Sequence, residues 1–496
     1  MNPEGTPNSD PTILTAEEAR DRKQPSDSSA TWSDRYVGVA TLLVAICFPA
    51  IWVYAGYRGF SFNQSLSFLI DDSWCVKGVE SLGSHCFGDY AALDDALAAG
   101  SLWSPELPTA TPYPALAWAP SIVFVLIGRL TNSWVLGRDL FLLVLACSVL
   151  TPAIWAARGS FARRAPLTLL LIGLASAPFL VVLDRGNAIG LVVAPLLGLA
   201  ISYSTGNFRR MMLFIVICSL LKPQLILLVL LFLVYKKYGY LLATVAISVA
   251  TTLAGFVIFP STFPQNIADW LTVITRYSGY QTLDSLFPYN LGVGRTLLTI
   301  LDLLQVRSIF GESARADLAV WLQAHNSLLV ILLLAIVTAA IMLRKPNSNP
   351  IFPLVAVLSI AVMAPGTAFS YYLALFLVPA ALVLRDPKPE LSTLSNRERW
   401  VGMLDAPDSG GKRAARFAKW SLVVGLGLLM APLVVPLPSF LGLPTVAPTP
   451  GMVIGLLQVL DGPILLLLLI ISVIMTAGRV ERGTLRARLM GSAASS

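Results

Sequence analysis

Residues 169–203 read LLLIGLASAPFLVVLDRGNAIGLVVAPLLGLAISY, two apolar runs joined by the four residues 184–187 (DRGN). A helix needs about 20 apolar residues to cross the hydrocarbon core of a bilayer. An ionisable side chain inside such a run costs about 2.5–3.5 kcal/mol on insertion scales, so the two charges mark a turn or a functional site. The stretch predicts two membrane-spanning helices, near 166–183 and 187–205, that meet at a membrane surface.

The same pattern recurs along the whole chain. Of its 496 residues 56% are hydrophobic and 13% are charged, whereas about 25% of the residues of an ordinary soluble domain are charged. We therefore predict an all-α polytopic membrane protein with about 11 to 13 transmembrane helices. The remaining spans are expected near 37–56, 114–131, 137–157, 211–235, 239–259, 325–343, 349–365, 367–385, 418–440 and 452–477, with a short interfacial or re-entrant helix at 290–304.

The distribution of charge predicts which segments lie on which side. Residues 57–113 contain seven acidic and two basic side chains, whereas basic side chains cluster in 386–416 and 479–496. The positive-inside rule places the basic segments in the cytoplasm and 57–113 outside. Arg158 also reads as cytoplasmic, yet the two spans predicted between the external segment 57–113 and Arg158 would leave it outside, and the sequence shows no additional crossing. The net charge of +7 is spread over such loops and does not indicate a nucleic-acid partner.

Several classes of site are disfavoured by composition. The chain has two histidines and five cysteines, too few for a histidine-rich metal site or a zinc ribbon. P-loop, GxGxxG and HExxH patterns are absent. We expect no metal and no cofactor, and neither an ATP-driven pump nor an enzyme of the soluble type.

Lys222 is a candidate ligand for phosphate. It lies in ICSLLKPQLILLVLLFLVY, residues 217–235, and Pro223 after it predicts a break in the helix. A break there can bring Lys222 and Arg185 to the same membrane side, where two cations and a free helix end suit a lipid-linked phosphate. The alternative is that both side chains snorkel from helix ends to the membrane surface.

The 57–113 loop supplies candidate carboxylates. Asp71 and Asp72 follow an apolar stretch, and either can take a proton from an acceptor hydroxyl; the alternative is a solvated loop acid. We choose Asp72, which is nearer the polar turn, with Asp89 as the next candidate. Cys75 and Cys86 are expected to form a disulfide in an oxidising exterior, the alternative being two free thiols.

Aromatic residues cluster in the predicted external segments. Such residues form an interfacial belt or stack on sugar rings. The candidates for sugar or acceptor binding are Tyr113, Tyr289, Tyr371 and Tyr372, together with Asn290.

The order of these elements resembles the GT-C superfamily of membrane glycosyltransferases. Within it, the pattern is similar to the family that contains the actinobacterial polyprenyl-phosphate-mannose-dependent α-1,2-mannosyltransferases of phosphatidylinositol mannoside or lipoglycan synthesis. The resemblance covers about residues 37–385 and departs from the family pattern at Ala115, at Arg185 and in the cysteine pair. The matching elements are Tyr113-Pro114, Arg185-Gly186-Asn187, Lys222-Pro223, Asn290 and Tyr371-Tyr372.

The resemblance implies an inverting transferase at the outer face of the plasma membrane. Such an enzyme passes a sugar, mannose before arabinofuranose, from a polyprenyl-phosphate donor to a lipid-anchored glycan. Lys222, Arg185 and Asn187 would then bind the donor phosphate, and Asp72 would be the base. The partners are the two lipid substrates and membrane lipids.

The chain accordingly divides into five expected segments. These are a disordered cytoplasmic tail (1–36), a GT-C-like catalytic module (37–385), a cytoplasmic loop (386–416), a transmembrane hairpin (417–478) and a basic cytoplasmic tail (479–496). A secondary transporter is the main alternative, since it too has about twelve spans and charges within the membrane. A lipid-linked glycan flippase without chemistry is a further alternative.

Overall fold

The computed structural model describes residues 88–98, 113–159, 172–258, 263–280, 290–305, 311–344, 349–384, 412–431 and 456–477, and a few single positions between them. Within these ranges the chain forms helices and one isolated β-bridge, between Asn290 and Phe369, and no strand. The protein is therefore all-α over the described residues, as predicted.

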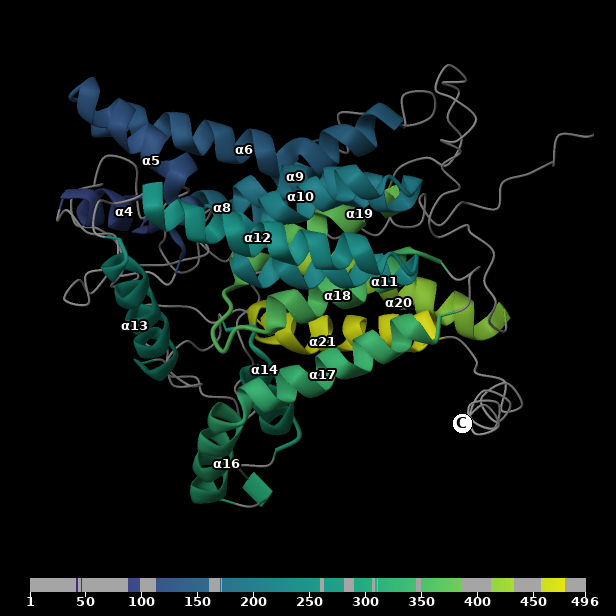
Figure 1. The fold of residues 1–496 in the computed structure, drawn as a ribbon. Coiled ribbons are helices and arrows are strands. Elements are labelled where there is room, and N and C mark those ends of the chain that lie inside the picture. Colours follow the sequence, from purple (N-terminus) through teal and green to yellow (C-terminus); the bar gives the residue numbers. More distant parts are fainter. Residues whose placement is uncertain are drawn as a thin grey trace, which may run out of the picture.

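Figure 1 shows the helices of the described ranges. In chain order they are α4 (Gly88–Ala98), α5 (Ala115–Leu130), α6 (Trp134–Gly159), α8 (Ala177–Arg185), α9 (Gly190–Thr205), α10 (Phe208–Leu221), η2 (Pro223–Leu230), α11 (Leu231–Val234), α12 (Tyr238–Ile258), α13 (Gln265–Tyr280), α14 (Val293–Leu303), α16 (Glu312–Ala324), α17 (Asn326–Met342), α18 (Ile351–Met363), η3 (Ser370–Phe376), α19 (Leu377–Leu384), α20 (Lys412–Met430) and α21 (Leu456–Ala477).

Three of these helices, α6, α12 and α21, are long and apolar enough to cross a membrane. The pair α16 and α17, bent by 62° at its junction, makes a fourth if it is one span. Five shorter apolar helical segments lie among them, at 115–130, 190–205, 223–234, 351–363 and 370–383. The predicted spans in the described ranges thus overlap with helices, and the predicted short helix at 290–304 contains α14.

The helix boundaries differ from the prediction in two places. Helix α20 begins at Lys412, inside the segment predicted as a cytoplasmic loop, because lysine and arginine are good helix formers and extend the helix beyond its apolar part. The segment between the predicted span at 239–259 and the predicted short helix at 290–304 contains the amphipathic helix α13.

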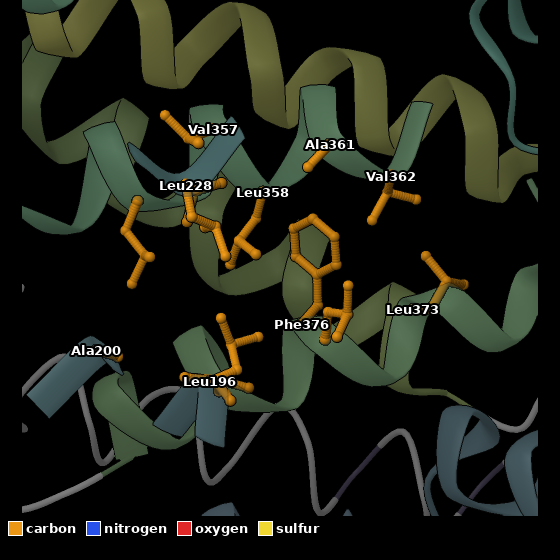
Figure 2. Close-up of a cluster of buried hydrophobic side chains, with 14 of the residues drawn as sticks. Leu196, Ala200, Leu228, Val357, Leu358, Ala361, Val362, Leu373 and Phe376 are labelled. Carbon is orange, nitrogen blue, oxygen red and sulfur yellow. The ribbon is translucent and has the colours of Figure 1, made fainter. Parts of the chain in front are cut away.

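Helix α18 lies at the centre of the bundle. All thirteen of its residues are buried, which follows from a sequence that is apolar on every side. Figure 2 shows Leu358 of α18 beside Leu228 of η2, Phe376 of η3 and Leu196 of α9, all of them buried. The two 3₁₀ segments are therefore parts of the core and not surface loops.

The course of α5 places Arg158 at the end of the bundle opposite to α4. Figure 1 shows α5 beside α4 at one end of the bundle (left), while α6 runs from that end to the other. Arg158 is in the last turn of α6. The chain therefore passes from one end of the bundle to the other once between residues 113 and 159.

Candidate functional site

Lys222 lies at the predicted break between two helical segments, α10 and η2. The residue before a proline is restricted to extended conformations, and Lys222 has φ −144° and ψ 101°. Pro223 then occupies the first position of η2, where a missing N–H group does no harm. The predicted break is confirmed, and the Lys222 side chain at this break is only 1% exposed.

Three tyrosines surround the ammonium group of Lys222. Its Nζ donates a hydrogen bond to the hydroxyl of Tyr113, just before α5, and lies 3.7 Å from the centre of that ring. The ring centres of Tyr372 and Tyr371, both in η3, are 5.3 Å and 5.9 Å away. Aromatic faces attract cations, most strongly where water is excluded. Four of the residues that sequence analysis assigned to substrate binding thus lie together.

Arg185 and Asn187 are fixed by the turn between α8 and α9. Gly186 adopts the left-handed conformation at φ 60°, and its N–H and that of Asn187 donate to the carbonyls of Leu183 and Val182. This is the arrangement that glycine favours at a helix end. The Asn187 Oδ1 accepts a hydrogen bond from the N–H of Ile189 at 2.8 Å. The predicted turn is confirmed, and its two polar side chains are buried.

Asp89, in the first turn of α4, links these two residues. Its Oδ2 accepts a hydrogen bond of 2.6 Å from Asn187 Nδ2, and its Oδ1 lies 3.6 Å from Arg185 Nη2. The carboxylate also acts electrostatically on Lys222. The Asp89 side chain is 29% exposed, compared with 8% for that of Arg185. Asp89 is thus the more accessible member of this ion pair.

Helix α4 is held in place by contacts on both sides of Asp89. Tyr90 is buried, stacks on Phe141 with 5.2 Å between ring centres, and meets Trp134 edge to face at 5.9 Å. Farther along the helix, Arg129 donates to Asp94 Oδ1 from both Nε (3.0 Å) and Nη2 (2.7 Å). These contacts fasten α4 to the α5–α6 pair and so place Asp89 at the site.

Asn290 holds the turn that precedes η3. Its Nδ2 donates to the carbonyl of Gly366 at 3.1 Å, and its Oδ1 accepts from the N–H groups of Gly292 (2.8 Å) and Ala368 (3.1 Å). The side chain thereby fixes the start of the segment that carries the two η3 tyrosines. A contact between Asn290 and a sugar stays a prediction.

The other predicted site residues lie outside the described residues. They are the candidate bases Asp71 and Asp72, the cysteines Cys75 and Cys86, and Tyr289. Within the described part of the chain there is no group of three or more histidine, cysteine or acidic side chains that could hold a metal ion.

The described site combines two cations, one carboxylate and several aromatic rings at one end of an apolar bundle. Cations hold an anionic group such as a phosphate, and aromatic rings suit the apolar face of a sugar or a lipid. Sequence reasoning ranked Asp89 behind Asp71 and Asp72, since an acid within a long loop carries no local sign of its partners. No protein-family model, curated protein or solved structure matches this chain.

Proposed function

We propose that the protein is a GT-C-like glycosyltransferase of the plasma membrane with its site facing outward. It transfers a sugar, with mannose favoured, from a polyprenyl-phosphate donor to a lipid-anchored glycan, with inversion at the anomeric carbon. Arabinofuranose is the alternative sugar. The proposal includes the 11 to 13 transmembrane helices and the long external loop predicted from about 20 apolar residues per span.

The observation that carries the proposal is the set of contacts around Lys222 and Arg185. The leaving group of such a donor is already a phosphate, so it needs cations and not a general acid. The acceptor hydroxyl needs one base, and inversion needs no second carboxylate as nucleophile. Lys222 and Arg185 supply the cations, and Asp72, with Asp71 beside it, is the proposed base.

The arrangement of the helices supports an outward-facing site. The C-terminal end of α6 and the junction of α11 with α12 lie at the end of the bundle away from α4 (Figure 1). Arg158 is at that end of α6, and Lys236 and Lys237 connect α11 to α12. Under the positive-inside rule this end is cytoplasmic, so the end with Asp89 is outside.

A transfer assay tests the proposal directly. Purified protein in detergent is mixed with a radiolabelled polyprenyl-phosphate mannose and a lipid-linked mannoside, and labelled product is separated from donor. We expect product with the wild type and almost none with Lys222→Met, which keeps the length of the side chain and removes its charge. If the wild type makes no product from mannose or arabinofuranose donors, the proposal is wrong.

One observation favours a transporter or a flippase as the second candidate. Two apolar segments, η2–α11 and η3–α19, begin as 3₁₀ helix and continue as α-helix, and both start at the site. Discontinuous helices at a binding site are typical of secondary transporters. Proteoliposomes distinguish the two functions: a flippase moves a labelled lipid-linked sugar between leaflets without forming a new glycoside, whereas the transferase forms one.

A further inference from the structure

The charged side chains at the site differ in how far they are exposed to a ligand. Among the side chains that the structure describes, Asp89 forms an ion pair with Arg185 and acts electrostatically on a second cation, Lys222. Both cations are buried, whereas Asp89 is partly exposed. A ligand phosphate that approaches Arg185 therefore also meets the Asp89 carboxylate.

The proposed reaction changes the charge of the phosphate. The bond between the anomeric carbon and the phosphate oxygen breaks, and a bond from the acceptor oxygen to that carbon forms. The acceptor proton passes to the base. The donor is a phosphodiester with one negative charge. The released lipid phosphate is a monoester, and a phosphate monoester carries a charge of about −1.5 to −2 near neutral pH. Transfer thus adds negative charge beside Arg185.

We propose that Asp89 makes this site prefer a singly charged phosphodiester to a doubly charged phosphomonoester, and so speeds release of the lipid phosphate after transfer. The inference rests on the proposed function and assigns Asp89 a role in specificity instead of proton transfer. Asp89 lies 3.6 Å from Arg185 and repels a dianion bound there twice as strongly as a monoanion.

The size of the effect follows from Coulomb's law. With an effective dielectric constant of about 40, suited to a partly exposed carboxylate, and a separation of about 6 Å, each unit of ligand charge changes affinity about tenfold. Removing the charge of Asp89 is therefore expected to tighten diester binding about tenfold and monoester binding about a hundredfold. The ratio of the two affinities shifts about tenfold toward the monoester.

Binding of two short lipids tests this without any need for turnover. Farnesyl phosphate is the monoester, and methyl farnesyl phosphate is the diester. Their dissociation constants are measured by titration calorimetry at pH 8 with the full-length protein in detergent. The variants are Asp89→Asn, which can still accept the hydrogen bond from Asn187, and Asp89→Glu, which keeps the charge. Asp94→Asn is the matched control, since it removes the same charge from the same helix but at the contact with Arg129.

The expected result is a tenfold shift of the affinity ratio in Asp89→Asn, and ratios close to that of the wild type in Asp89→Glu and Asp94→Asn. Equal tightening of both lipids, or no change, overturns the inference and leaves the proposed function intact. A shift of equal size in Asp94→Asn also overturns it, because docking of α4 would then be the cause. A wild type that binds neither lipid refutes the proposed function, and the inference with it.

Discussion

Under the proposed function, the guanidinium group of Arg185 binds the donor phosphate in a way that lysine cannot. Its Nη2 lies 3.6 Å from Asp89, and its side chain is buried in a turn with fixed backbone geometry. The planar guanidinium group offers paired donors to a phosphate, whereas an ammonium group is a single point charge on a flexible stem. We expect Arg185→Lys to weaken donor binding by about tenfold to a hundredfold, equivalent to the 1.5–3 kcal/mol of a hydrogen bond to a charged group.

Thermal unfolding in detergent separates this effect from a loss of fold. Arg185→Lys keeps the charge, and lysine at the last residue of a helix is favourable, so the midpoint is expected to change little. Normal donor binding by this variant would reassign Arg185 to packing.

Ionisation of the Tyr90 phenol is expected to lower the stability of the protein at alkaline pH. Burial, with a further contribution from the Asp94 carboxylate, raises the pKa of the Tyr90 phenol to about 12. The folded state therefore holds this proton more tightly than the unfolded state, whose phenol titrates near pH 10. The stabilisation is complete below pH 10 and is lost as the pH rises from 10 to 12.

The pH dependence of stability is compared between the wild type and Tyr90→Phe, because other groups also titrate between about pH 10 and 12 and the difference isolates the phenol of Tyr90. The Tyr90 hydroxyl has no hydrogen-bond partner among the described residues, so its removal is expected to disturb the packing on Phe141 very little. The rate of protease cleavage within α4 should increase between about pH 10 and 11.5 in the wild type, and it should increase less in Tyr90→Phe. The range begins at the ordinary pKa of a phenol, about 10. Identical pH profiles would contradict the prediction.

At the scale of single elements, Gly292 controls the contact between α14 and the turn before η3. A Cβ atom at this position would lie 2.7 Å from the carbonyl oxygen of Gly366 and 2.9 Å from that of Pro365. Backbone atoms in a hydrogen-bonded turn cannot move aside cheaply. We expect Gly292→Ala to destabilise the protein by about 1–3 kcal/mol, as overpacking does, and to weaken substrate binding through Tyr371 and Tyr372.

A glycine in open surroundings provides the control for this variant. Gly239, in the first turn of α12, has nothing within 4 Å of the position of a Cβ atom. Gly239→Ala should be neutral or stabilise the protein by up to about 1 kcal/mol, because alanine is the better helix former. Both midpoints come from thermal unfolding in detergent. If the two variants unfold alike, close packing at Gly292 is not the cause.

Local patterns were predictable at this scale, and long-range contacts were not. The turn at Gly186 and the break at Lys222 follow from glycine, proline and charges within apolar runs, so the sequence was sufficient for both. The partner of Asp89 was not predictable, because Asn187 is 98 residues away. No local rule connects a loop acid to a particular turn, and only the docking of α4 through Tyr90 and Asp94 brings them together.

At the scale of the whole molecule, the course of α5 affects the number of crossings to be expected before Arg158. The 16 residues of α5 are as apolar as those of a crossing helix, so composition alone suggested a crossing. The structure instead keeps α5 at the end with α4. Such a helix can bury its apolar face against α6 where small residues let the two backbones approach closely. Gly137 of α6 is such a residue, because a Cβ atom there would clash with the carbonyl of Phe124 in α5.

This arrangement predicts the side of the membrane on which the α5–α6 turn lies. Thr131 is exposed in that turn, and Lys237 is exposed at the opposite end of the bundle, before α12. In a chain whose native cysteines are replaced by serine, Thr131→Cys should react with a membrane-impermeant maleimide in intact cells. Lys237→Cys should react only after permeabilisation. If α5 were a full crossing, Thr131 would lie on the cytoplasmic side with Lys237, and both cysteines would require permeabilisation.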